Sequence, residues 1–181
     1  PAVGSGAYCS QLVRILWNKA SRKWNLEDES AFRFEVCRRV IFCADIDSEA
    51  LELAKVVLWI SAGCPESGIN LNLANCDSLG VGSCEEKEVW KVHTGFEIKD
   101  GFDVVFGNPP YVRVKPEELA GFAMAKTRNL YCAFTELGLN LLNDQGLLCF
   151  IVPQSIVISK ETMPLRKRLI EDSSSLRMQT F

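Results

Sequence analysis

The segment GNPPY, at residues 107–111, has residue types that could hold a planar amine, and it directly follows the apolar run 102–107. Two successive prolines fix the backbone and remove two N–H donors, so that the Asn108 side chain and nearby carbonyls face outward as acceptors. The Asn108 amide and the Pro109 carbonyl could bind both hydrogens of an exocyclic amine and leave its nitrogen open for attack. Tyr111 offers a ring face on which a base stacks. A structural Pro-Pro turn is the alternative interpretation.

A second candidate is the glycine turn at residues 1–6, PAVGSG, which is followed by a helical pattern. Gly4 and Gly6 can adopt backbone conformations closed to other residues and leave room for a ligand at the amino end of the helix. The spacing differs from the dinucleotide signature G-x-G-x-x-G, because position 9 is a cysteine. Taken alone, the turn is also compatible with an ordinary tight turn.

Carboxylates follow two of the apolar runs. Asp45 ends the run 39–44, where a nucleotide-binding βαβ unit carries the acceptor for ribose hydroxyls. We expect Asp47 to cap the next helix and Asp45 to face a ligand. Asp77 could accept a hydrogen bond from an adenine amine, and a solvated turn residue is the alternative.

The elements that must position these residues alternate along the chain. Helices are predicted at 7–20, 47–60, 130–143 and 161–171, and strands at 39–44, 69–75, 102–107 and 147–153. We expect a loop with at most a brief strand at residues 80–101. We expect an ordered loop with helical turns at residues 112–128. This alternation predicts an α/β fold in which helices on both faces cover a parallel sheet, with ligands at the carboxyl ends of the strands.

The ends of the chain suggest a fragment. It opens on the glycine turn without a preceding strand, and residues 180–181 resemble the start of a new strand. We therefore expect residues 1–181 to form one partial domain, truncated at both ends.

Composition narrows the class of protein. A net charge of −3 provides no general attraction for nucleic acid, so such binding would need a local patch. The eight cysteines lack a Cys-x-x-Cys pair and are interpreted as reduced core thiols, and with the single His93 they make a metal site improbable. No apolar run is long enough to span a membrane, which predicts a cytoplasmic protein without a membrane partner.

Six segments in order resemble a known family: PAVGSGAY, ADID, CDSL, FGNPPY, LYCAF and LLCFIVP. They are similar to the motifs of the gamma-class N6-adenine-specific DNA methyltransferases of restriction–modification systems, which carry a Rossmann-like S-adenosylmethionine-dependent methyltransferase sheet. The glycine turn precedes the Asn108 motif, and only a short segment separates Asp77 from Asn108. This order is that of the gamma class.

The resemblance implies roles for individual residues. Asn108, Pro109, Pro110 and Tyr111 would bind an adenine flipped out of double-stranded DNA, because a stacked base cannot present its amine. S-adenosylmethionine would be held by residues of the glycine turn, of both strand ends and of the 130–134 segment: Pro1, Ala2, Gly4, Ser5, Gly6, Asp45, Ile46, Asp77, Ser78, Leu79, Asn108, Tyr131 and Phe134. Core packing is the alternative for the last two.

The resemblance further implies direct methyl transfer without a metal. The target-recognition domain of such enzymes is absent here, and a restriction or specificity subunit or domain is a possible partner in the parent protein. Arg113, Lys115, Lys126 and Arg128 could contact phosphates or form a solvated loop. Alternatives are a protein-glutamine methyltransferase, an RNA or cytosine-amine methyltransferase, and a fragment without catalytic activity.

Overall fold

The computed structural model describes residues 1–80, 87–96 and 99–179. It is a mixed α/β structure with two small parallel sheets. The chain divides into two compact units: Pro1–Ser78 with Val92–Phe96, and Leu79–Lys91 with Glu97–Phe181. The strand expected at residues 180–181 lies outside the described residues.

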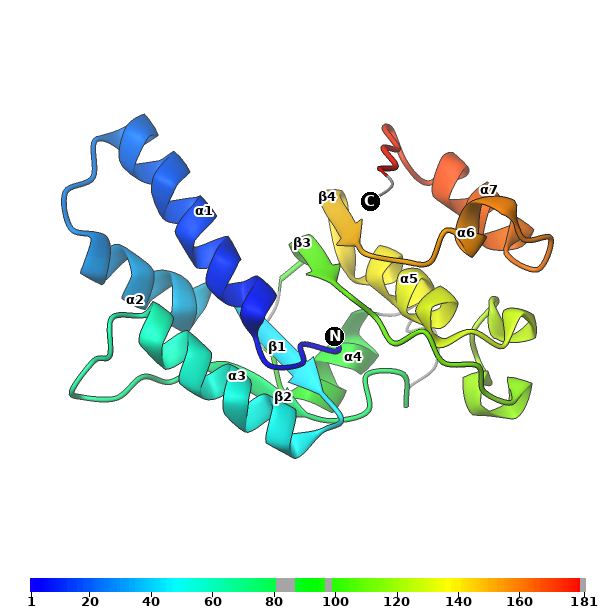
Figure 1. The fold of residues 1–181 in the computed structure, drawn as a ribbon, viewed down its shortest axis with the longest axis horizontal. Helices are drawn as coiled ribbons and strands as arrows, with labels where there is room; N and C mark the ends of the chain where they lie inside the picture. The colour runs from blue at the N-terminus through cyan, green and yellow to red at the C-terminus, as the bar shows by residue number, and fades with distance from the viewer. Residues whose placement is uncertain (81–86, 97–98, 180–181) are drawn as a thin grey trace. The chain divides into compact units, whose positions relative to one another are not determined.

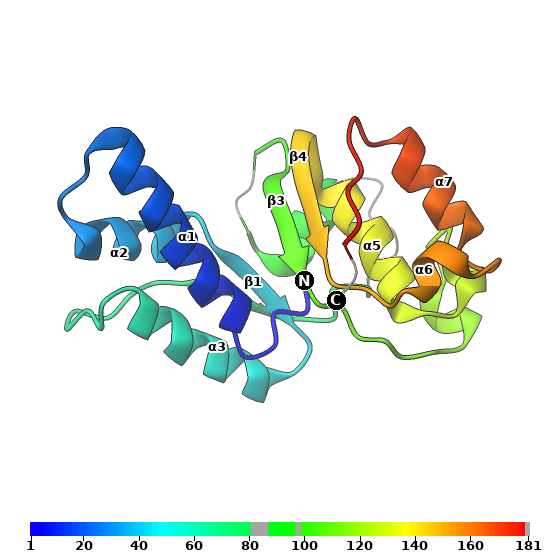
Figure 2. The same cartoon turned by 45° about the horizontal axis from the view of Figure 1, so that its top comes forward.

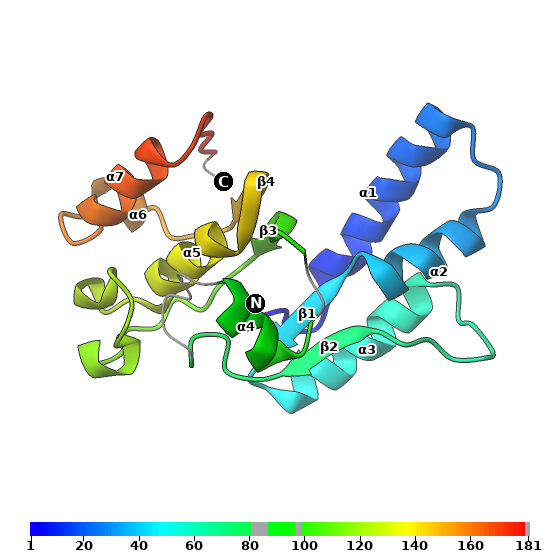
Figure 3. The same ribbon diagram turned by 180° about the vertical axis from the view of Figure 1, so that it is seen from behind.

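The first unit contains three long helices and one pair of strands (Figure 1). Its elements in order are α1 (Ala7–Trp24), α2 (Glu29–Arg39), β1 (Phe42–Asp45), α3 (Ser48–Ser61) and β2 (Asn72–Asn75). β1 and β2 run parallel and in register from Phe42 opposite Asn72 to Asp45 opposite Asn75, and they lie side by side in Figure 3. α3 packs on both strands and also contacts α1 and α2.

Apolar spacing explains α1 and α3. Val13 and Ala20 of α1 and Leu51, Ala54 and Leu58 of α3 are buried at helical intervals, as the 3.6-residue period requires. α1 ends at Asn25, a C-cap in the left-handed conformation whose N–H donates to the Ser21 carbonyl.

α2 was not predicted. Its apolar residues form no clear stripe, and it is stabilised by local polar contacts instead. Asp28 caps its first turn by accepting from the Ala31 N–H at 2.9 Å, and Glu29 pairs with Arg33 one turn later. Because α2 extends to Arg39, the strand predicted at 39–44 is shorter and shifted, at Phe42–Asp45.

The second unit contains the other pair of strands. Its elements after α4 (Lys87–Thr94) are β3 (Phe102–Gly107), η1 (Pro116–Leu119), η2 (Ala125–Thr127), α5 (Leu130–Leu141), β4 (Leu142–Phe150), α6 (Ser155–Ile158) and α7 (Met163–Glu171). β3 and β4 are parallel and lie side by side in Figure 2, and α5 packs on both. The 3-10 turns η1 and η2 confirm the ordered loop predicted at 112–128, whereas α4 lies where a loop was predicted.

The predicted boundary between helix and strand at residues 141–147 is wrong. α5 ends at Leu141, and β4 begins at once at Leu142 and ends at Phe150. The ladder passes from Phe102 opposite Leu142 to Val104 opposite Leu147, so that the Asn-Asp-Gln-Gly segment 143–146 forms an irregularity inside β4. Asn143 holds this irregularity by donating to the Asp103 carboxylate at 2.7 Å.

One apolar cluster joins the helices of the second unit: Met124, Tyr131, Cys132, Ile156, Leu165 and Leu169. It fixes α5, α6 and α7 to one another, and Arg166 reinforces it by donating to the carbonyls of Ile156 and Ser159 at 2.8 and 2.7 Å. The last helix begins at Met163, two residues later than predicted.

Seven cysteines are described, and all are free thiols. Four of them are buried, at positions 9, 37, 43 and 132, in agreement with core thiols, but Cys64 and Cys149 are exposed, which corrects the prediction for these two. Burial raises the pKa of the Cys37 thiol from 9.0 to about 11. None of the described helices combines the length and apolarity needed to cross a bilayer.

Candidate functional site

The glycine turn is tied to the end of β1 by backbone and side-chain hydrogen bonds. The Val3 N–H donates to the Ala44 carbonyl at 3.1 Å, so the segment before α1 runs beside the strand. The next N–H, that of Gly4, donates to Asp45 Oδ2 at 2.8 Å. Two stretches that are far apart in the sequence therefore meet where β1 ends.

The two glycines of the turn, Gly4 and Gly6, have different surroundings. Both have positive φ, +56° at Gly4 and +79° at Gly6. A Cβ at Gly6 would lie 2.9 Å from Ala54 Cα, whereas a Cβ at Gly4 would meet nothing within 4 Å. Gly6 therefore lets the turn pack on α3, and Gly4 leaves its main chain accessible to a ligand. Among the other turn residues, Ala2 has a φ of +55°, Pro1 is half-buried and Ser5 is exposed.

Asp47 caps α3, as predicted, and Asp45 makes different contacts. Asp47 accepts from the N–H groups of Glu49 and Ala50 at 2.9 and 3.3 Å, and it is the N-cap of α3. Asp45 accepts from Gly4 through one oxygen and from the Asp47 N–H at 3.0 Å through the other. Each carboxylate oxygen has a second lone pair, so Asp45 retains acceptor capacity toward a ligand.

Asn75 is a positioning residue that sequence reasoning missed. Its Nδ2 donates to the carbonyls of Asp45 and Ile46 at 3.0 and 3.1 Å and so fixes the chain beyond β1. Ile46 is 70% exposed, which presents an apolar surface next to the Asp45 carboxylate. An asparagine as the last residue of a strand is the signal that could have indicated this clamp.

Beyond β2, the chain carries the predicted Asp77, Ser78 and Leu79. Asp77 is exposed, and His93 Nε2 lies 2.9 Å from its carbonyl. The Ser78 side chain is 3% exposed, and its Oγ has no hydrogen-bond partner within the described part of the chain. A buried hydroxyl without a hydrogen-bond partner is unusual in a folded protein. Leu79 follows and is half-buried.

In the second unit, Asn108 directly follows β3 and its side chain is contacted by Tyr111. The Tyr111 hydroxyl donates to Asn108 Oδ1, and the Ile151 carbonyl lies 3.1 Å from the same hydroxyl. The Ile151 N–H donates to the Gly107 carbonyl at 3.0 Å, which anchors that carbonyl beside the strand end. Asn108 and Tyr111 are exposed, Pro109 is buried and Pro110 is half-buried.

The ring of Tyr131 packs against the ring of Tyr111. The two rings meet edge to face with centroids 6.4 Å apart, and the Tyr131 hydroxyl lies 3.1 Å from Ser155 Oγ. Burial raises the pKa of Tyr131, so its hydroxyl remains protonated as a hydrogen-bond donor. Tyr131 and Phe134 are both buried, as core residues of α5.

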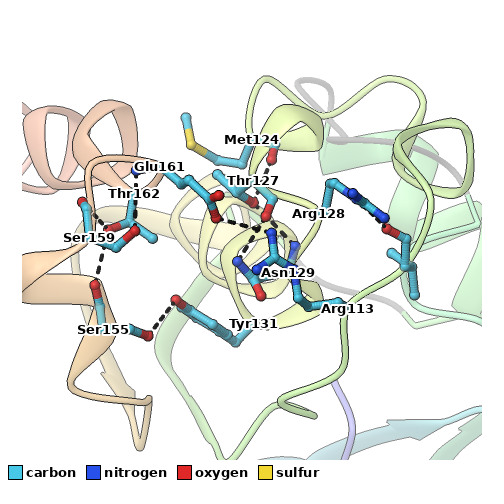
Figure 4. A network of polar contacts seen from close by, with 11 residues as sticks. Arg113, Met124, Thr127, Arg128, Asn129, Tyr131, Ser155, Ser159, Glu161 and Thr162 are labelled. Atoms are coloured by element: carbon cyan, nitrogen blue, oxygen red, sulfur yellow. Dashed lines mark hydrogen bonds and ion pairs between the residues drawn. The ribbon is translucent and has the colours of Figure 1, made fainter.

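The segment after Tyr111 is held by an antiparallel bridge between Arg113 and Asn129. Figure 4 shows the polar network around this bridge, in which Asn129 turns back to the Thr127 carbonyl and Arg113 reaches Glu161. The bridge joins the Asn108–Tyr111 segment to the start of α5. Sequence reasoning named Arg113 but missed its acidic partner.

The second unit offers the Asn108 side chain as an acceptor for an amine. The first unit offers the accessible main chain of Gly4 and the carboxylate of Asp45, and it also contains the buried hydroxyl of Ser78. Within the described residues, no group of three or more His, Cys, Asp or Glu side chains is arranged to hold a metal ion.

Comparison with known proteins identifies one family. The sequence model described as Eco57I restriction-modification methylase matches residues 39–181. This range includes Asp45 and Asn108 and begins after the glycine turn.

Two curated proteins are similar over shorter ranges. A Methanocaldococcus jannaschii protein, named for a type II restriction enzyme and methyltransferase, is 36% identical over 84 residues, which are 44% of this chain and 7% of the relative. The type II methyltransferase M.BsuBI of Bacillus subtilis is 32% identical over 87 residues, which are 46% of this chain and 17% of the relative. The match thus spans less than a fifth of either relative.

Proposed function

The chain belongs to the Eco57I restriction-modification methylase family, and from this premise we propose that it transfers a methyl group from S-adenosylmethionine to the N6 amine of an adenine in DNA. The adenine is flipped out of the duplex, since its amine is out of reach inside the stack. The observation that carries the proposal is the exposed Asn108 amide directly after a parallel strand, with Tyr111 beside it.

The residues of the first unit fit S-adenosylmethionine. Asp45 keeps lone pairs for ribose hydroxyls, the exposed Ile46 can pack on the adenine ring, and the unpartnered Ser78 hydroxyl can meet the adenine edge. Gly4 leaves its main chain open to the methionine part. When bound, this cofactor supplies a methyl group on a positively charged sulfur that leaves as a neutral thioether.

The residues of the second unit act on the amine. Asn108 Oδ1 and the Pro109 carbonyl accept its two hydrogens, which orients the nitrogen lone pair toward the incoming methyl group. Asn108 Oδ1 can keep the Tyr111 hydrogen bond at the same time, because an amide oxygen has two lone pairs. Tyr111 contributes its ring face to the base, and one amine proton is released to solvent after the N–C bond forms.

We further propose that the chain has the Rossmann-like fold of S-adenosylmethionine-dependent methyltransferases. Asp45 and Asn108 each stand at the carboxyl end of a strand, which is where ligands bind in the sheets of such folds. The remaining recognition of DNA belongs, in this proposal, to other parts of a longer protein.

The test is to incubate the protein with tritiated S-adenosylmethionine and DNA, RNA or protein substrates. Label should enter DNA as N6-methyladenine, and Asn108→Ala should lower the rate about 10²- to 10³-fold because a preorganised acceptor is lost. Asn108→Asp keeps an acceptor and should retain more activity than the alanine variant. Label confined to RNA or protein would contradict the proposal.

A further inference from the structure

Arg113 and Glu161 form an ion pair close to the Asn108–Tyr111 segment, which is the candidate site for the adenine base (the candidate base site). Arg113 Nη2 lies 3.1 Å from Glu161 Oε2, and the two side chains are 55% and 53% exposed. Arg113 is two residues beyond Tyr111, and Glu161 lies in the connection between α6 and α7 (Figure 4). The pair therefore joins two segments at the surface of the second unit.

The backbone that carries Arg113 is fixed. On either side of it, the Val114 N–H donates to the Arg128 carbonyl at 2.9 Å, and the Leu130 N–H donates to the Val112 carbonyl at 3.0 Å. These two bonds form the antiparallel bridge opposite Asn129. The backbone position of Arg113, two residues from Tyr111, is therefore fixed, although its side chain is solvated.

The backbone that carries Glu161 is also fixed. The next residue, Thr162, is fully buried, and its hydroxyl contacts the Ser155 and Ser159 carbonyls at 3.2 and 3.0 Å. Arg166 contacts the same hydroxyl at 2.8 Å. Glu161 is therefore held where it meets Arg113.

Stability does not explain this pair. An ion pair between exposed side chains contributes little to the stability of the fold, because solvent screens it. The Arg168–Glu136 pair in the same unit differs, since Glu136 is buried and also accepts two backbone N–H groups. An exposed pair on two fixed backbones can exchange its anion at little cost in stability.

Further exposed cations lie in the segment that follows Arg113. Lys115, Lys126 and Arg128 are exposed, and none of the three has an ion-pair partner within the described part of the chain. One nearby carboxylate, that of Glu118, is engaged locally, because its Oε1 accepts from the Lys115 N–H at 2.9 Å. The surface thus suits an extended anion rather than a single small one.

We propose that Glu161 occupies the Arg113 guanidinium in the DNA-free protein and that Arg113 exchanges this carboxylate for a backbone phosphate next to the flipped adenine. The inference rests on the proposed function, because it requires DNA at this site. A guanidinium binds phosphate through two parallel N–H groups, which a single carboxylate oxygen on a surface side chain does not match. Glu161 then acts as a competitor that keeps contact with DNA weak and reversible.

The test measures binding of a fluorescein-labelled duplex with one unpaired adenine by anisotropy at low salt. Glu161→Gln should raise the affinity about three- to tenfold, because it removes the competing anion. Arg113→Gln should lower the affinity and reduce the slope of log K against log salt by about 1, the signature of one phosphate contact. In the double variant, the gain from Glu161→Gln should vanish.

Matched controls come from the exposed Lys167–Glu171 pair of α7. Glu171→Gln and Lys167→Gln change the net charge equally but should shift affinity less than their counterparts at 161 and 113. Equal effects at both pairs would overturn the proposal, as would a Glu161→Gln variant that shows no measurable binding at the highest protein concentration.

The two proposals can fail separately. If Asn108→Ala abolishes adenine methylation while Glu161→Gln behaves like Glu171→Gln, the phosphate exchange is wrong and the proposed function stands. If Glu161→Gln raises DNA affinity but the label never enters adenine, the proposed adenine methylation is wrong, and only the exchange of Glu161 for a DNA phosphate stands, without a flipped adenine beside it.

Discussion

At the residue scale, the turn before α1 shows how two glycines with similar φ can have different requirements. Gly6 packs its Cα against the main chain of α3 at Ala54, whereas Gly4 faces open space. Both positions lie in the left-handed region, which costs an L-residue roughly 1–2 kcal/mol. Only Gly6 carries a steric requirement in addition.

We therefore expect Gly6→Ala to destabilise the protein by about 3 kcal/mol or more, since strain adds to a clash with backbone atoms that cannot easily move. Gly4→Ala is the matched control and should cost about 1 kcal/mol from strain alone. Urea titration followed by circular dichroism measures both. Equal losses at the two positions would contradict the packing argument.

The roles of single residues were predictable where the local sequence determines them. Asp47 as the cap of α3 follows from its position before a helical pattern, and the structure confirms it. The contact of Asp45 with Gly4 was not predictable, because the two residues are 41 positions apart and meet only through the path of the chain beside β1.

At the scale of elements, a buried carboxylate links α5 to the preceding loop. Glu136 accepts from the N–H groups of Ala123 and Met124 at 3.0 and 2.9 Å, and Arg168 of α7 lies 3.6 Å from it. Three segments of the second unit are thus joined through one side chain. The loop that follows the candidate base site depends on this contact for its position.

Glu136→Ala should destabilise the second unit by about 2–4 kcal/mol, because it leaves two N–H groups without acceptors and Arg168 without its buried partner. Glu136→Gln keeps one acceptor oxygen and should lose less. Thermal unfolding gives the stability, and hydrogen exchange at Ala123 and Met124 should accelerate in the alanine variant. The exposed Glu117 provides the control, and a similar loss in Glu117→Ala would contradict the assignment.

Apolar periodicity predicted the elements with buried stripes, namely α1, α3 and α5, each within a few residues of its observed bounds. It missed α2, whose stability comes from a cap and ion pairs, and α4, which lies in a polar segment. The start of β4 was misplaced because Asn143–Gly146 was interpreted as a helix stop, whereas these residues form an irregularity inside the strand.

At the scale of the whole molecule, charge and length limit what the chain can bind alone. The net charge is −3, and the candidate phosphate contacts all lie in the segment 113–128 of the second unit. The two relatives extend far beyond the matched range. Under the proposed function, the affinity of this chain for DNA comes from few contacts.

We expect the 181-residue chain to bind duplex DNA in the non-specific range, about 10⁻⁴ to 10⁻⁶ M. The slope of log K against log salt should correspond to about one to three phosphates, since few cations surround Arg113. Anisotropy titrations at several salt concentrations measure both quantities. A much steeper slope would indicate a larger basic interface than the described surface provides.

The sequence alone named the residues of the candidate site, and their roles stay predictions; the contacts that hold these residues in place could not be predicted. The Asn108–Tyr111 segment stands out through its two prolines, whatever the fold. Tyr111 contacts Ile151, 40 positions away, and Arg113, just beyond the segment, contacts Glu161, 48 positions away, so only the folded chain brings these residues together. Such contacts have no local sequence pattern.

The antiparallel bridge at Arg113 and Asn129 closes residues 115–127 into a loop whose two ends are tied to each other. Changes of length inside a loop closed at its base add little entropy cost and need not move the chain outside it. Asn108 before the loop and α5 after it can therefore keep their geometry while residues 115–127 are lengthened or replaced. The same scaffold is thereby open to diversification by insertion at a point close to the Asn108–Tyr111 segment.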